Sequence, residues 1–252
     1  MAKLIFLGTA SAVAYPGHEN SFLVLQGENS SILVDCSAHP VMRLKKAGID
    51  FNHLSDLIIT HFHPDHVSGL ASLIMDMWIL GRKKELNIHG CEHAITRAVK
   101  MMDLFGWEDW TEMYPVHFHT LPLEELIPVI DNEEFKILSS PVEHMIPNLG
   151  IRIEYKKGDF VVAYSSDTLP IPQTVRLAAD ADVLIHEASG TTFHHSTAAQ
   201  AGEIATQANV KTLYLIHYPS EEVISLESTL NEAQKTFPGN VILAEDFMEI
   251  DF

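Results

Sequence analysis

The chain has 252 residues, of which 46% are hydrophobic and 20% are charged, and this composition excludes an intrinsically disordered protein. No apolar run reaches the roughly 18–20 residues that a transmembrane helix requires, so we expect no membrane span. The formal net charge of -18, from 16 basic and 34 acidic residues, predicts a surface that repels long polyanions such as nucleic acids.

The first half of the sequence alternates short apolar runs with stretches of helical spacing. Residues 27–30 predict a turn between two strands, and Gly48 and Gly81 predict the ends of two helices. We expect strands at residues 3–7, 22–26, 31–35, 57–60 and 86–89. We expect helices at residues 41–47, 67–80 and 92–105.

The second half is richer in strands. We expect them at residues 116–120, 126–130, 134–139, 150–155, 160–165, 182–186, 212–216, 241–244 and 247–250. We expect helices at residues 172–179, 196–208 and 225–236. This order predicts one α+β domain over residues 1–252, an αββα sandwich in which two mixed sheets pack face to face with helices outside.

The strongest functional signal is the run Thr60-His61-Phe62-His63-Pro64-Asp65-His66. His61 and His63 are two residues apart in an extended segment, so their rings can lie on the same side. Asp65 and His66 follow at the start of the next helix, so one tight loop offers three imidazoles and a carboxylate. These groups suit zinc, and also iron or manganese. Four ligands are too many for one zinc ion that keeps an open position, so the pattern favours two metal ions.

This run resembles the H-x-H-x-D-H signature of the metallo-β-lactamase superfamily, and the resemblance extends along most of the chain. Pro141-Val-Glu-His144-Met-Ile-Pro147, Tyr164-Ser-Ser-Asp167-Thr168 and Leu215-Ile-His217-Tyr218 resemble its later ligand segments. The resemblance implies that a first ion is held by His61, His63 and His144, and a second ion by Asp65, His66 and His217. It implies Asp167 as the residue that bridges the two ions, which are expected to be Zn2+, with Mn2+ or Fe2+ as alternatives.

Three further segments are similar to the ribonuclease Z branch of that superfamily, which includes phosphodiesterases. They are Phe6-Leu-Gly-Thr-Ala, Asp182-Val-Leu-Ile-His-Glu-Ala-Ser and His194-His-Ser-Thr-Ala-Ala-Gln-Ala. The resemblance implies a phosphodiesterase in which a metal-bridging hydroxide is the nucleophile. It implies catalytic roles for Asp65, for His195 as a proton donor or phosphate contact, and for Glu187 as the group that orients His195. Thr197 and Gln200 have capping-box spacing, which predicts a helix N-terminus just after His195.

The chain departs from the long-form ribonuclease Z pattern in one respect that bears on the substrate. Only 23 residues separate His144 from Asp167, which leaves no room for the arm that grips transfer RNA. The loop at residues 15–20 also lacks basic side chains. These features favour a small-molecule or nucleotide phosphodiester over transfer RNA. The alternatives are another hydrolase of the same fold, namely a lactonase, thioesterase or arylsulfatase, or a non-catalytic metal-binding module.

The remaining expectations concern the cell and the supporting residues. The chain begins directly in a strand-like pattern, and its two cysteines, Cys36 and Cys91, form no C-x-x-C pair, so we expect a cytoplasmic protein without a disulfide. Asp35 follows a strand, where it is either a hydrogen-bond partner of a ligating histidine or a plain turn residue. The aromatic stretch at residues 105–114 could serve as a substrate wall, as core or as a dimer contact. The resemblance is compatible with a homodimer.

Overall fold

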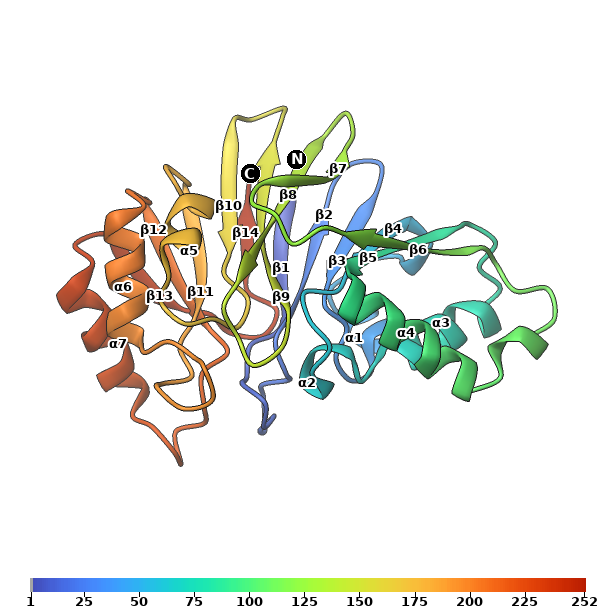
Figure 1. The fold of residues 1–252 in the computed structure, drawn as a ribbon, viewed down its shortest axis with the longest axis horizontal. Helices are drawn as coiled ribbons and strands as arrows, with labels where there is room; N and C mark the ends of the chain where they lie inside the picture. Colours follow the sequence, from blue (N-terminus) through green and yellow to red (C-terminus); the bar gives the residue numbers. More distant parts are fainter. Residues whose placement is uncertain (1) are drawn as a thin grey trace.

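The computed structural model describes residues 2–252 as two seven-stranded sheets stacked between two layers of helices (Figure 1). The first sheet runs in the order β14-β1-β2-β3-β4-β5-β6. Its strands are β1 (Lys3–Gly8), β2 (Phe22–Gln26), β3 (Ser31–Val34), β4 (Leu54–Ile58), β5 (Leu86–Cys91), β6 (Val116–Leu121) and β14 (Glu249–Asp251).

The second sheet runs in the order β13-β12-β11-β10-β9-β8-β7. Its strands are β7 (Ile127–Asp131), β8 (Phe135–Val142), β9 (Asn148–Tyr155), β10 (Phe160–Tyr164), β11 (Val183–Glu187), β12 (Thr212–Ile216) and β13 (Asn240–Leu243). The expected α+β sandwich of two mixed sheets is confirmed, since each sheet combines parallel and antiparallel pairs.

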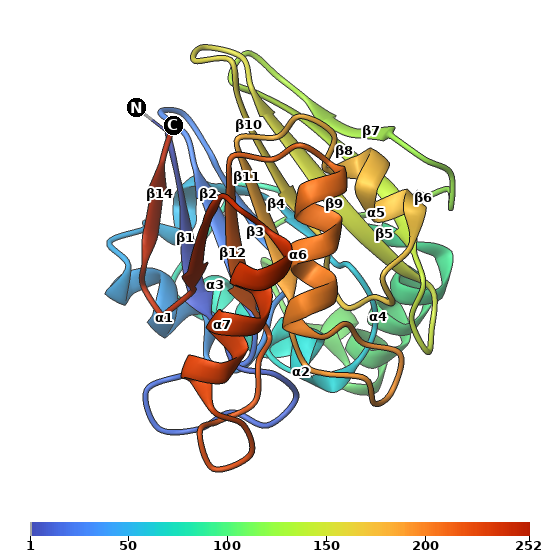
Figure 2. The same ribbon diagram turned by 90° about the vertical axis from the view of Figure 1, so that its left-hand side faces the viewer.

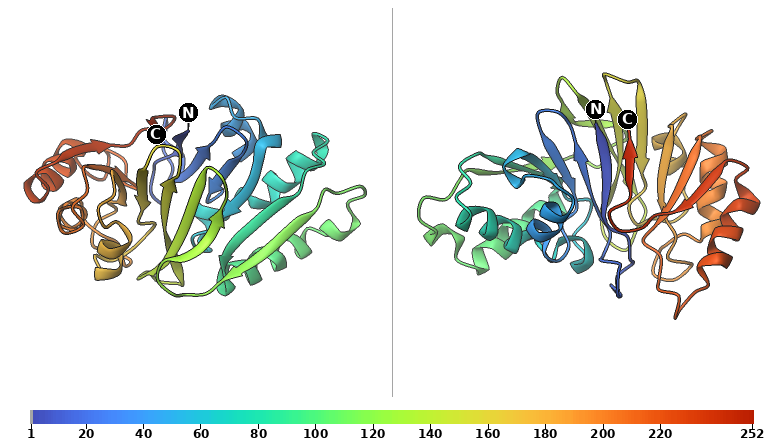
Figure 3. Two further views of the ribbon diagram at one scale, coloured as in Figure 1. Left: turned by 90° about the horizontal axis from the view of Figure 1, so that it is seen from above. Right: turned by 180° about the vertical axis from the view of Figure 1, so that it is seen from behind.

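Helices cover the outer face of each sheet, as Figures 1 and 3 show. The helices on the first sheet are α1 (Pro40–Lys46), α3 (Leu70–Ile79) and α4 (Glu92–Leu104). Those on the second are α5 (Pro172–Leu177), α6 (Ala198–Gln207) and α7 (Leu226–Thr236). Short α2 (Pro64–Val67) and the 3-10 turns Phe51–His53 and Trp107–Asp109 complete the set. Among the described residues, no helix has the length and apolar character needed to cross a bilayer.

The helix expected at residues 67–80 is interrupted in the structure. The chain forms α2, breaks at Ser68 and Gly69, and resumes as α3. A Cβ atom on Gly69 would lie 1.9 Å from the carbonyl oxygen of Ser37, so the backbone approaches this loop more closely than any side chain permits. Backbone hydrogen bonds from Cys36 to His66 and from Gly69 to Cys36 then hold α2 beside the segment that follows β3.

The topology gathers several loops at one edge of the sandwich, the edge formed by the C-terminal ends of its parallel strands. β3, β4 and β5 are parallel neighbours in the first sheet, and β10, β11 and β12 are parallel neighbours in the second. Because parallel strands end on the same side, the segments that follow them meet there, as in other open sheets that bind ligands at this edge. Both chain termini lie at the opposite edge, where β14 pairs with β1 (Figures 1 and 2).

Candidate metal centre

The structure brings all seven sequence-predicted metal residues together at this edge. The backbone between β4 and α2 carries His61 and His63, and the loop between β8 and β9 carries His144. Ligand atoms form two groups, each within 4.8 Å: His61, His63 and His144 in one, and Asp65, His66, Asp167 and His217 in the other. Elements distant in sequence therefore supply the side chains of one site.

The first group has the spacing of ligands around a single ion. The Nδ1 atom of His63 lies 3.1 Å from Nε2 of His61 and 3.1 Å from Nε2 of His144. Three nitrogens about 2.0–2.1 Å from a tetrahedral zinc ion would lie about 3.3 Å from one another. Burial lowers the pKa of all three rings, which keeps them neutral and able to offer a lone pair.

Asp167 lies between the two groups. Its Oδ2 atom is 3.4 Å from Nε2 of both His66 and His217, 3.7 Å from Nε2 of His61 and 3.8 Å from Nε2 of His144. The Nε2 atom of His66 and the Oδ1 atom of Asp167 are buried and have no hydrogen-bond partner. Buried polar atoms without partners are costly, and a cation is the kind of group that both atoms can bind. The residues present therefore fit divalent metal ions.

Asp65 completes the second group. Its Oδ2 atom is 3.3 Å from Nε2 of His217 and 3.5 Å from Nε2 of His66. Burial alone would raise the pKa of Asp65, but the hydrogen bond to His217 and the nearby histidine charges lower it to about 2. The carboxylate is thus ionised and available as a ligand near neutral pH.

His66 is held by Asp35, as one of the two sequence interpretations of Asp35 proposed. The Nδ1 atom of His66 donates to Oδ2 of Asp35 over 2.8 Å, which directs Nε2 towards Asp65 and Asp167. The carboxylate of Asp35 also accepts from the backbone N–H and the hydroxyl of Thr60 over 2.8–2.9 Å. Asp35 is fully buried and has a positive φ of 62°. Partners of this kind fix both the orientation and the tautomer of a ligating histidine.

Two other histidines have hydrogen-bond partners that the sequence did not predict. His217 donates from Nδ1 to the hydroxyl of Ser189 over 2.7 Å, and that hydroxyl also contacts the carbonyl oxygen of His217. His144 donates from Nδ1 to the carbonyl oxygen of His194 over 3.1 Å. Ser189 lies two residues after Glu187, and only this closeness to a site motif could have pointed to it.

His195 and Glu187 form a hydrogen-bonded pair beside these groups. The Nδ1 atom of His195 donates to Oε1 of Glu187 over 3.0 Å, and its ring centre lies 4.9 Å from that of His144 and 5.4 Å from that of His217. Burial would lower the pKa of His195, but the hydrogen bond to Glu187 and its charge raise it overall. The pair therefore favours the protonated form of the His195 ring, whose Nδ1 atom is taken up by Glu187.

Glu187 is itself fixed by backbone groups. It is fully buried and accepts hydrogen bonds from the backbone N–H groups of Thr168, Ser189 and Ser196 over 2.9–3.1 Å. The expected capping box between Thr197 and Gln200 is present, and it starts α6 just after His195. Cap and carboxylate together set the position of the His195 ring.

Three histidines outside the seven metal residues have hydrogen-bond partners of their own. His89 bonds to Asp56 over 2.8 Å, and His119 bonds to Asn87 over 3.0 Å. His186 bonds through Nδ1 to the carbonyl oxygen of Glu187. Both cysteines are buried and free, so no disulfide forms between them.

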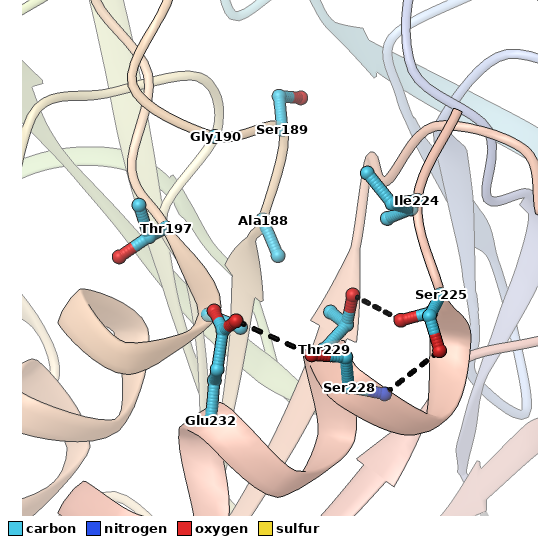
Figure 4. A pocket seen from close by; sticks show the side chains of 10 residues that line it. Ala188, Ser189, Gly190, Thr197, Ile224, Ser225, Ser228, Thr229 and Glu232 are labelled. Carbon is cyan, nitrogen blue, oxygen red and sulfur yellow. Dashed lines mark hydrogen bonds between the residues drawn. The ribbon is translucent and has the colours of Figure 1, made fainter.

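A pocket of about 270 Å³ lies behind Ser189, between the first turns of α6 and α7 (Figure 4). The hydroxyl groups that line it already take part in hydrogen bonds within the protein. Thr197 and Ser225 cap the two helices, Thr229 donates to the carbonyl oxygen of Ser225, and Ser228 contacts Glu232. These hydroxyl groups therefore stabilise the first turns of α6 and α7 and are not donors for a bound anion.

Comparisons with known proteins agree with this geometry. The family model described as "Anti-Pycsar protein Apyc1" matches residues 2–234. Ribonuclease Z from Archaeoglobus fulgidus is 27% identical, and the match covers 99% of this chain and 97% of the relative. That alignment spans 306 positions, so at least 54 of them are filled only by the relative.

Solved structures show the same architecture. The metallo-beta-lactamase fold protein YhfI from Bacillus subtilis superposes with a TM-score of 0.81 at 22% identity, covering 99% of this chain and 98% of that one. The short form of human tRNase Z also reaches a TM-score of 0.81, at 26% identity and with the same coverage. The fold is therefore the metallo-β-lactamase fold.

Proposed function

The chain belongs to the family described as Anti-Pycsar protein Apyc1, and we propose that it hydrolyses a small phosphodiester with the help of two divalent metal ions. Its ribonuclease Z relatives and its fold make it a metal-dependent hydrolase of phosphodiester bonds. The observation that supports two ions best is the pair of buried atoms without partners, Nε2 of His66 and Oδ1 of Asp167, among the gathered imidazoles and carboxylates.

The distances between the ligand atoms suggest which residues would hold each ion. The first ion would be held by His61, His63 and His144, the second by Asp65, His66 and His217, with Asp167 shared between them. Five imidazoles with two carboxylates suit Zn2+ best among common divalent ions, and Mn2+ or Fe2+ are the alternatives. Bound ions would supply Lewis-acid stabilisation of the phosphate oxygens and lower the pKa of a bound water towards neutrality.

His195 and Glu187, beside the proposed ions, would assist the departure of the leaving group. Glu187 raises the pKa of His195, which favours the protonated ring, and the Nε2 atom of that ring would pass a proton to the departing oxygen. Glu187 keeps the ring in place through Nδ1, and backbone N–H groups of Thr168, Ser189 and Ser196 hold its carboxyl group. Asp65 would contribute to catalysis as a ligand that contacts the second ion.

The loops at this edge favour a small substrate over RNA. None of them contains a lysine or arginine, as the sequence shows for residues 9–21, 35–39, 59–69, 143–147, 165–171, 188–197 and 217–225. β9 and β10 are joined by a tight turn at residues 156–159, so no arm extends from the stretch between His144 and Asp167. RNA binding depends on neutralising several phosphates with basic side chains, which these loops do not provide.

The first test is an assay of the metal-loaded protein on bis(p-nitrophenyl) phosphate, with a lactone, a thioester and an aryl sulfate in parallel. Metal content is measured on the same sample. We expect phosphodiester turnover with about two ions per chain. Turnover of only another ester, with both ions bound, would keep the metal centre and overturn the proposed reaction. Protein purified without chelator that holds no metal would favour a non-catalytic module.

A further inference from the structure

A second hollow lies between the loop that follows β1 and the loop that follows β12, which begins with His217. Its volume is about 920 Å³, against about 270 Å³ for the pocket in Figure 4. Both loops project from the same edge of the molecule as α2, which Figures 1 and 2 show in two perpendicular views. The hollow therefore opens on the side of the molecule that carries the metal residues.

Backbone hydrogen bonds connect the two loops of this hollow next to His217, one of the proposed metal ligands. The N–H of His217 donates to the carbonyl oxygen of Thr9 over 2.9 Å, and the N–H of Ser11 donates to the carbonyl oxygen of Tyr218 over 3.2 Å. Ser11 and Pro219 line the hollow, so its wall begins two residues after His217. The two loops that form the hollow are therefore hydrogen-bonded to each other at the position where the second loop supplies His217.

Two apolar side chains face the hollow without contributing to the protein core. Val13 is 77% exposed and Val223 is 72% exposed, and each lies on one of the two loops. Tyr15 and Leu226 line the same hollow and are anchored against the core cluster under the second sheet. Exposed valines bring no burial energy to folding, but a ligand that covers them would gain it.

The charged groups of the hollow are acidic. Glu221 and Glu222 line it, and neither loop contains a lysine or arginine. A second phosphate or a carboxylate on the substrate would be repelled there. The apolar walls and the acidic rim thus suit an organic group that carries no negative charge.

We propose that this hollow is a substrate subsite that takes the uncharged, ring-sized organic group of the phosphodiester, with Val13 and Val223 as specificity-determining residues. The inference rests on the proposed phosphodiesterase function and adds which part of the substrate is selected and where. The chemical class that it favours has one phosphate and an aromatic or otherwise apolar substituent.

The test compares two diesters with the same leaving group, bis(p-nitrophenyl) phosphate and methyl p-nitrophenyl phosphate. The metal-loaded full chain, the double variant Val13→Ser/Val223→Ser and the control Leu123→Ser are assayed on both. Leu123 is 49% exposed and lies outside the loops of the site. We expect the aryl-to-methyl ratio of kcat/KM to fall at least about tenfold in the double variant, mainly through KM, and to stay at the wild-type value in Leu123→Ser.

A binding measurement without turnover separates the subsite from the chemistry. Diphenylphosphinate should bind at least about tenfold more weakly to the double variant than to the wild type in calorimetry. An unchanged ratio and an unchanged affinity would overturn the subsite and leave the phosphodiesterase standing. A wild type that hydrolyses neither diester would overturn the proposed function itself. If the serine variant does not fold, the isosteric Val13→Thr/Val223→Thr variant is put through the same comparison.

Discussion

Replacing Asp35 with asparagine should lower the affinity for the second metal ion without changing the shape of the site. Asparagine matches aspartate in size and tolerates the positive φ of 62° at this position. The carboxylate accepts hydrogen bonds from the backbone N–H and hydroxyl of Thr60 and from Nδ1 of His66, each within 2.8–2.9 Å. An amide has one acceptor oxygen, so its NH2 group must face one of these donors. When it faces His66, the ring loses the partner that directs Nε2 to the metal.

The expected size of the effect follows from that loss. Removing a partner of a ligating histidine typically weakens metal binding about 10–100-fold. Loss of a hydrogen bond to a charged group costs about 1.5–3 kcal/mol, which bounds the fall in the free energy of unfolding of the metal-free protein. Asp35 contacts His66 directly and reaches His61 only through the hydroxyl of Thr60, so the second ion should account for most of the change.

The assay is a titration of metal-free protein against a chromophoric chelator that resolves the two binding steps. Asp56→Asn is the matched control, because Asp56 bonds to His89 over the same 2.8 Å in the same sheet but outside the metal centre. We expect Asp35→Asn to weaken the second step about 10–100-fold and Asp56→Asn to leave both steps unchanged. Wild-type affinity for both ions in Asp35→Asn, or equal weakening in the control, would refute the reasoning.

Three further predictions concern the catalytic pair and the first ion, and a fourth concerns the second ion. His195→Ala should keep both ions and lose about 10²–10⁴-fold in kcat, and wild-type turnover would remove His195 from the mechanism. In Glu187→Gln, the loss of activity at high pH should begin at lower pH than in the wild type, because Glu187 raises the pKa of His195 and the protonated ring is the active form; an unmoved pH profile would contradict this. His63→Ala should lower metal content, measured by mass spectrometry, and abolish activity. Ser189→Ala should weaken the second ion about tenfold in the chelator titration, because Nδ1 of His217 loses its acceptor, and unchanged affinity would show that the hydroxyl is dispensable.

Local patterns in the sequence predicted the fold well. The strand expected at 212–216 is β12 to the residue, and the helix expected at 225–236 begins one residue later as α7. The strand expected at 57–60 is β4, Leu54–Ile58, because the N–H of Thr60 bonds to the carboxylate of Asp35 instead of joining the strand ladder. Such a bond between distant residues leaves no mark on apolar periodicity.

In the candidate site, too, contiguous patterns could be predicted from the sequence, and contacts between distant segments could not. The cluster around His61 is contiguous in sequence, so its spacing alone indicates a metal site. His144 and His217 were expected only through resemblance, because nothing local distinguishes them from other polar residues at strand ends. The contact between Ser189 and His217 and the choice of Nδ1 rather than Nε2 on His63 depend on how separate loops pack. Apart from the position of Ser189 at the end of the Glu187 segment, the sequence contains no short-range signal for either.

The pairing of β14 with β1 also has a practical consequence for handling the protein. Lys3 pairs with Asp251, so the two chain ends leave the domain side by side, on the edge opposite α2 and the metal residues (Figures 1 and 2). A fluorescent partner, an affinity tag or a surface linker joined at either end would leave the mouth of the site facing solvent. Immobilised enzyme attached in this way should accept its substrate as freely as enzyme in solution.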